Sequence, residues 1–303
     1  MLLVKELDAV PYYQQSIFLS CLLGGWQEGK YFARMKLASG GSLRFVLLAP
    51  SHGVIPSTFT GVRPDSLRYH DLLSKMQELR GKIYLEDGAI QPSQLDSGRH
   101  RLSSDEESWH LLILDEGRQV RGCIRCREHS ADIDPRELAV SNSALARSME
   151  WKWTLENAVR MELALARRLG CCIVELGGLA LDRVIRGTTE AVRLALAMYA
   201  LCQQLGGAVG LSTVTQRHCS ASILRRIGGR PLESSGAQLP PYYDPGYDCQ
   251  MELMRFYSWD PNPRYRVWID DITAELQEIC VLTRQSGTFS TATLAYAASE
   301  GRR

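Results

Sequence analysis

An isolated carboxylate stands in an apolar segment in the second half of the sequence. Glu175 lies in the run Cys-Cys-Ile-Val-Glu-Leu at residues 171–176, which otherwise has the composition of a buried strand. Burial raises the pKa of a carboxyl group unless a partner stabilises the charged form, and a raised pKa suits a general base. An ion pair with an arginine such as Arg183 is the structural alternative, and the sequence leaves both roles open.

The segment after Glu175 has the composition of a phosphate-binding loop. It ends with Arg-Gly-Thr-Thr-Glu-Ala at residues 186–191, where a long apolar helix is predicted to begin. Unpaired backbone N–H groups and the helix dipole attract anions to a helix N-terminus. Gly187 allows the backbone to approach a diphosphate, and Arg186 supplies a fixed positive charge. With the hydroxyls of Thr188 and Thr189, residues 186–191 predict a phosphate cradle.

Further residues are candidates for proton transfer. His218 follows a predicted strand at 208–214, and its position near a sheet end and its ordinary pKa suit catalysis; capping the next helix is the alternative. The run at 239–248 holds Tyr242, Tyr243 and Tyr247, any of which could supply a proton, although a connection between strands is the favoured interpretation. His110 lies in a predicted strand and is interpreted as a core or substrate-facing residue.

The cysteines do not form a metal-binding pattern. Cys123 and Cys126 have the Cys-x-x-Cys form, but no second pair follows at zinc-ligand spacing. Side chains three positions apart on a strand also point to opposite faces. We therefore predict no metal. The odd total of nine cysteines, without a secretion signal, favours a reducing cytoplasm.

The elements that would position these residues follow an α/β order. A hairpin is predicted at 108–127, and the tight turn Asp-Glu-Gly at 115–117 joins its strands. Further strands are predicted at 43–49, 82–86, 171–176, 208–214 and 249–256, and helices at 12–24, 71–79, 144–169, 190–205, 220–227 and 269–281. Gly170 is the expected C-cap of the long helix before Glu175.

Composition limits the partners. The chain of 303 residues has 35 basic and 34 acidic residues, so no bulk charge favours nucleic acid or an anionic membrane. Hydrophobic residues make up 45% of the chain, which is ample for a core. The apolar run at 16–26 is shorter than the roughly 20 residues that span a bilayer. We expect a cytoplasmic protein. The sequence does not indicate its oligomeric state.

The strand, loop and helix around residues 171–205 resemble those of the GNAT superfamily of acyltransferases. Arg186-Gly-Thr-Thr189-Glu190-Ala191 is similar to the superfamily signature Arg/Gln-x-x-Gly-x-Gly/Ala, with threonine at position 189 in place of glycine. Among these enzymes, the segment from Glu175 to Arg186 looks like that of acyl-homoserine-lactone synthases and long-chain N-acyl amino acid synthases, although the lactone synthases usually have arginine where Gly178 stands. The resemblance covers roughly residues 80–258.

This resemblance implies a mixed α/β central sheet flanked by helices, with residues 1–80 as an N-terminal extension, 81–260 as the GNAT-like domain and 261–303 as a C-terminal helical tail. It implies that Leu179, Ala180 and Leu181 offer backbone groups to the pantetheine arm of an acyl thioester, and that residues 186–191 hold its phosphate.

The implied reaction is direct transfer of an acyl group from coenzyme A or an acyl-carrier protein to a small-molecule primary amine, without a metal. Glu175 would deprotonate the amine, with His218 and Tyr243 as further catalytic candidates. A catalytically silent GNAT fold that binds a ligand or partner is the alternative.

Overall fold

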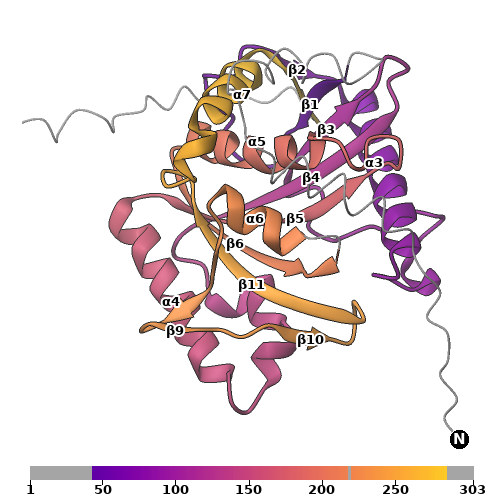
Figure 1. Cartoon of the computed structure of the whole chain (residues 1–303). Helices are drawn as coiled ribbons and strands as arrows, with labels where there is room; N and C mark the ends of the chain where they lie inside the picture. The colour runs from indigo at the N-terminus through magenta and orange to yellow at the C-terminus, as the bar shows by residue number, and fades with distance from the viewer. Residues whose placement is uncertain (1–42, 218–219, 285–303) are drawn as a thin grey trace, which may run out of the picture.

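The computed structural model describes residues 43–217 and 220–284. Its main feature is one mixed sheet with the strand order β10-β11-β6-β5-β4-β3-β1-β12-β2, and β7 pairs with β11 (Figure 1). The strands of this sheet are β1 (Arg44–Leu48), β2 (Val62–Pro64), β3 (Trp109–Leu114), β4 (Val120–His129), β5 (Cys172–Leu181), β6 (Ala208–Thr215), β7 (Arg230–Pro231), β10 (Tyr242–Asp244), β11 (Cys249–Tyr257) and β12 (Cys280–Thr283). A separate small hairpin joins β8 (Glu233–Ser234) to β9 (Ala237–Gln238).

Helices cover both faces of the sheet. The helices are α3 (Ser66–Glu86), α4 (Lys152–Leu169), α5 (Glu190–Gln204), α6 (Ser220–Ile227) and α7 (Arg266–Glu278), with short 3-10 turns at Pro92–Gln94, Pro135–Glu137, Ala139–Asn142, Ala144–Arg147 and Pro263–Tyr265. Side chains of β3 alternate between the two layers, because Leu111 and Ile113 pack with α5 and α7, whereas Leu112 and Leu114 pack with α3. Strands buried on both faces are apolar throughout, which explains the continuous hydrophobic run of β3. The expected sheet flanked by helices is confirmed.

Helix α4 packs on the same face of the sheet as α3, over the β5 and β6 half. Its buried stripe contacts Ile173, Val209 and Leu211. The helix ends at Gly170, which adopts the left-handed conformation with φ 65° and donates to Ala166 and Arg167 carbonyls. The predicted C-cap is therefore confirmed.

The centre of the sheet contains a splay between two parallel strands. β5 and β6 pair from Cys172 opposite Ala208 to Leu176 opposite Ser212. Beyond this point β5 continues along β4 as far as Leu181, while β6 continues along β11. The β4–β5 register also shifts beside Gly178, whose φ is 66°. The two strands thus separate after residue 176. α5 follows the loop 182–189 and begins at Glu190, where the sequence predicted a helix.

Two sequence-based assignments of secondary structure are wrong, and a further helix was predicted with the wrong starting residue. Residues 82–86 form the last turns of α3 instead of a strand, because Ile83 continues the buried helical face of Met76 and Leu79. The predicted helix at 269–281 ends at Glu278, and Cys280–Thr283 is β12, which pairs in parallel with β1. The long helix α4 begins at Lys152, eight positions later than predicted.

Segments near both ends of the described chain enter the main sheet. β1 lies between β3 and β12, and α7 packs against α5 (Figure 1). The predicted helix at 12–24 lies outside the described residues. No helix in the two described stretches is both long and apolar enough to cross a bilayer.

Candidate active site beside the splayed strands

Glu175 lies on β5 immediately before the splay, with only 5% of its surface exposed. Its Oε2 atom lies 3.0 Å from Nε2 of His129, the last residue of β4. Its Oε1 atom accepts a hydrogen bond of 2.5 Å from the backbone N–H of Ala139. The suggested ion pair with Arg183 is not formed, because Arg183 contacts Glu86 at 3.1 Å. The carboxylate therefore has two donors, and one of them is a titratable side chain.

The Glu175–His129 pair has the arrangement of a base and its orienting carboxylate. When the carboxylate accepts from Nε2–H, the proton stays on that nitrogen and the lone pair stays on Nδ1. Among the residues that the structure describes, Nδ1 has no assigned hydrogen-bond partner. The pair can thus take up a proton at Nδ1 while Glu175 stabilises the imidazolium.

His129 was not among the candidate residues predicted from the sequence. The signal was present in β4, where Ile124 and Cys126 are buried in the layer of α5. Because strand side chains alternate, Arg125, Arg127 and His129 share the opposite face, which is the face of Glu175. Extending the predicted hairpin strand by two residues past 127 would have placed His129 on the same face as Arg125 and Arg127, although not beside a particular residue of β5.

A guanidinium lies next to the splay on the same face. Arg125 stands opposite Gly177, and its Nη1 donates a 2.5 Å hydrogen bond to the hydroxyl of Ser104. Its Nε is buried without a hydrogen-bond partner. A side chain at Gly178 would meet Cβ of Arg125 at 3.1 Å, so the glycine makes room for this arginine.

Two tyrosines face the same region. Tyr84 lies in the last turns of α3, and Tyr247 lies in the turn between β10 and β11. Burial raises the pKa of both phenols, and each pKa is also influenced by the nearby charge of Arg125. The phenols therefore stay protonated near neutral pH and can donate hydrogen bonds.

A buried ion pair supports this region from α3. Arg80 donates to both oxygens of Asp105, at 3.0 and 2.7 Å, and neither side chain is exposed by more than 2%. Burial would raise the pKa of Asp105, but the hydrogen bonds and charge of Arg80 hold it below its usual value. His110 contacts the Asp105 carbonyl at 2.7 Å, and burial lowers its pKa to about 4. His110 is therefore a neutral core residue at pH 7.

The predicted phosphate cradle at residues 186–191 differs from the expectation in one respect, because the guanidinium of Arg186 is already paired. Arg186 is bidentate to Asp87, at 3.2 and 3.0 Å, and its Nε donates to the Leu181 carbonyl. Its guanidinium thus ties the loop to β5 and to the end of α3. Gly187 has φ 76°, and no atom lies within 4 Å of the position of a Cβ.

The start of α5 is only partly capped. The hydroxyl of Thr188 accepts from the N–H of Glu190, whereas the N-cap Thr189 makes no side-chain hydrogen bond to the helix. Glu190 is paired with Arg193 at 3.2 Å, which offsets its negative charge. Ala191 follows in the first turn of this helix.

The remaining predicted residues are dispersed. Leu179, Ala180 and Leu181 form the splayed part of β5, where Ala180 faces α3 and the two leucines face α5. Tyr243 lies on β10, three strands from β5, is half exposed and donates to Asp248 at 2.5 Å. His218 lies outside the described residues. Within the described ranges no group of three or more potential metal ligands is found.

The chain matches no family model and no curated protein. Similar solved structures include the CoA-dependent acyl-homoserine lactone synthase BjaI with SAM and isopentyl-CoA, at 16% identity and a TM-score of 0.49 over 82% of this chain and 96% of that one. FeeM, an N-acyl amino acid synthase from uncultured soil microbes, has 12% identity and a TM-score of 0.41 over 72% and 92%. A mosquito arylalkylamine N-acetyltransferase has 16% identity and a TM-score of 0.41 over 71% and 100%.

Proposed function

We propose that this protein transfers an acyl group from an acyl thioester to a primary amine, and the splay of β5 from β6 is the observation that carries the proposal. Residues 177–181 pair with β4 on one side, and no described strand pairs with their other side. Unpaired strand edges bind extended ligands through backbone hydrogen bonds. The amide groups of a pantetheine arm match such an edge, so the thioester would lie in the opening beside Gly177.

The diphosphate of the donor would lie at the loop 187–191 and the start of α5. This helix of 15 residues directs backbone N–H groups to that point, and the space beside Gly187 is open. Because Arg186 is held by Asp87, its role in this proposal is to fix the loop in place instead of contacting phosphate directly.

The His129–Glu175 pair would serve as the base. Nδ1 of His129 takes a proton from the ammonium group of the acceptor, and Glu175 stabilises the imidazolium that forms. The amine nitrogen then attacks the thioester carbonyl, the bond between carbon and sulfur breaks, and the thiolate leaves. The nitrogen gives up its second proton as the amide forms, and this proton replaces the one that the thiolate takes up from a phenol. The location of Tyr247 favours it over Tyr243 as the donor of the proton that the thiolate takes up.

The direct test is release of free thiol from an acyl thioester in the presence of amines. The purified protein is incubated with acetyl-CoA, long-chain acyl-CoAs or an acyl-carrier protein, each with a panel of amines, and the N-acyl product is identified by mass spectrometry. We expect amine-dependent thiol release with at least one acyl-CoA. Tight CoA binding without thiol release from any pair would instead support the non-catalytic alternative, and no binding of either donor would refute the proposal.

A further inference from the structure

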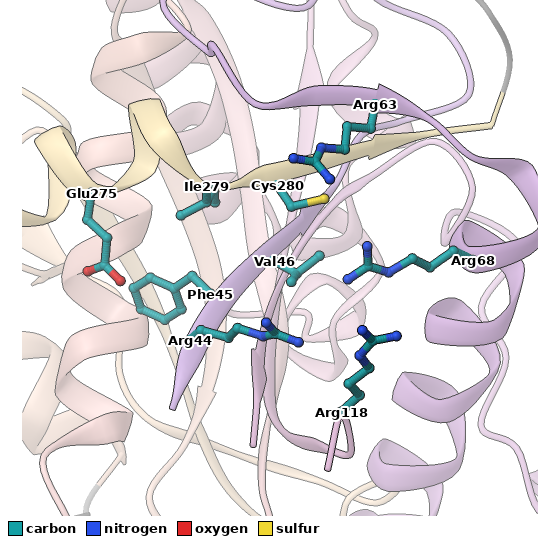
Figure 2. A pocket seen from close by; sticks show the side chains of 9 residues that line it. All are labelled: Arg44, Phe45, Val46, Arg63, Arg68, Arg118, Glu275, Ile279 and Cys280. Atoms are coloured by element: carbon teal, nitrogen blue, oxygen red, sulfur yellow. The ribbon is translucent and has the colours of Figure 1, made fainter. Parts of the chain in front are cut away.

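Four arginines surround a pocket of about 420 Å³ at the β1 and β12 part of the molecule. They come from four different elements. Arg44 starts β1, Arg63 lies in β2, Arg68 lies in the first turn of α3, and Arg118 lies in the turn between β3 and β4. Figure 2 shows their guanidinium groups directed into a common space around Val46.

These four guanidinium groups stand outside the ion pairs of the described parts of the chain, although Asp65 and Asp71 lie near Arg68. None of them takes part in an ion pair there, whereas Arg121, close to Arg118 in sequence, contacts both Asp115 and Asp182. The only carboxylate that lines the pocket is Glu275, and Arg193 already contacts it at 2.5 Å. The pocket therefore combines a concave shape with four guanidinium groups that form no ion pair with a described residue.

Converging like charges are unfavourable unless something offsets them. Like charges on neighbouring positions destabilise a fold, and unpaired arginines ordinarily spread into solvent. At two of the four positions the backbone itself is held by local structure. Arg68 is only half exposed, and its own backbone N–H is held by the N-cap Asp65. Arg118 adopts a left-handed φ of 60° in its turn. A bound anion would remove the repulsion.

The geometry points to a binding site for a small anion that carries two or more phosphate groups. A guanidinium presents paired donors that match phosphate oxygens, and four of them exceed the need of a single monoanion. Apolar residues such as Val46, Ile279 and Cys280 also line the pocket and can contact an uncharged part of the same ligand. The volume lies within the range of small-molecule sites, which is about 300–1,000 Å³.

This site is distinct from the proposed acyl-transfer site. In the sheet, β1 is separated from the splayed β5 by β3 and β4, which places the two strands roughly 14 Å apart. The phosphate chemistry could come from two sources. One is the phosphate-bearing end of coenzyme A extending from the splay, and the other is a separate phosphorylated metabolite.

Calorimetry with inorganic tripolyphosphate on the full chain at constant ionic strength tests the site. The double variant Arg63→Gln/Arg118→Gln removes two exposed charges from the pocket, and Arg167→Gln/Arg168→Gln on α4 removes two exposed charges elsewhere. We expect the pocket variant to raise the Kd for tripolyphosphate at least about tenfold and the α4 variant to change it less than about twofold. Inorganic monophosphate should bind at least about tenfold more weakly than tripolyphosphate.

Thermal unfolding adds a readout that a purely structural role would not give. Without ligand, the pocket variant should unfold at the same or a higher temperature than the wild type, because repulsion is reduced. Tripolyphosphate should raise the unfolding temperature of the wild type and of the α4 variant only. Equal affinity of both variants for tripolyphosphate would overturn the assignment, and so would a wild type that does not bind tripolyphosphate. Binding of heparin without binding of tripolyphosphate would also overturn it.

Titration of the same variants with coenzyme A identifies the source. A parallel loss of CoA affinity in the pocket variant would assign the pocket to the acyl donor. Unchanged CoA affinity together with lost tripolyphosphate binding would assign it to a separate ligand. The inference does not depend on acyl transfer, since both titrations are carried out without an amine and without thiol release.

Discussion

The two oxygens of Glu175 accept from different donors, and this division determines what a substitution can reveal. In Glu175→Gln the amide oxygen can still accept from the Ala139 N–H, but the NH₂ group would face Nε2 of His129. The imidazole proton would then move to Nδ1, which could no longer act as a base. We expect turnover to fall roughly 10²–10⁴-fold with CoA affinity unchanged, measured as steady-state thiol release and by calorimetry.

His129→Gln is the matched control for this prediction. It should reduce turnover by a similar factor, and the double variant should be no slower than the single variants, because the two residues act as one unit. If Glu175 has only a structural role, Glu175→Gln should instead lower the unfolding temperature and leave the rate per folded molecule intact. A stable and fully active variant would direct attention to His218.

At the scale of single residues, the sequence pointed to Glu175 as a candidate but not to its partner His129. A charged residue in an apolar strand is visible in the sequence, so Glu175 could be selected without a structure. His129 could not be paired with it, because the register between β4 and β5 includes a shift beside Gly178. Likewise, Arg186 was correctly placed in the loop, but its contact with Asp87 depends on where α3 ends.

The loop between β5 and α5 offers a test at the scale of elements. Gly187 has a positive φ that asparagine and aspartate tolerate better than other side chains, and an added side chain meets no neighbour. Gly187→Asp places a negative charge where the diphosphate is proposed to bind, while Gly187→Asn has nearly the same shape without the charge. We expect the aspartate variant to bind CoA roughly tenfold more weakly than the asparagine variant by calorimetry, a difference of about 1.4 kcal/mol.

A second glycine provides the control for backbone conformation. Gly236, in the turn between β8 and β9, also has a positive φ and open space around it. Gly236→Asp should leave CoA affinity unchanged. Equal CoA affinity for Gly187→Asp and Gly187→Asn would locate the phosphate elsewhere on the molecule.

Most elements were predictable where one local signal dominated. The apolar run of β3, the turn after it and the C-cap at Gly170 each have a specific local cause. The strand predicted at 82–86 was wrong because a short apolar run such as Lys-Ile-Tyr-Leu-Glu fits a strand as well as a buried helical turn. Only the packing of α3 against β3 and β4 decides between them.

At the scale of the whole molecule, the main sheet includes β1 and β12, which lie outside the segment 81–260 that we predicted as the GNAT-like domain. β12 pairs with β1, and β1 pairs with β3 over five residues. Long-range pairing of this kind leaves no periodic signal in a sequence, so the role of residues before 80 and after 260 could not be derived from it. The proposed site also depends on the chain before residue 81, because α3 begins at Ser66 and contributes Arg80 and Tyr84.

The boundaries of the functional unit can be tested with a fragment of residues 81–260. This fragment would lack β1, β12 and α7, and it would expose the buried and largely apolar β3 as a sheet edge and the buried face of α5. Exposed apolar edges aggregate, and the loss of a packed helix removes many buried contacts. We therefore expect the fragment to aggregate or to unfold without a cooperative transition in circular dichroism, whereas the full chain unfolds cooperatively. If the fragment unfolds cooperatively and binds CoA as tightly as the full chain, residues 81–260 form an autonomous domain and the strands at both ends are accessory to it.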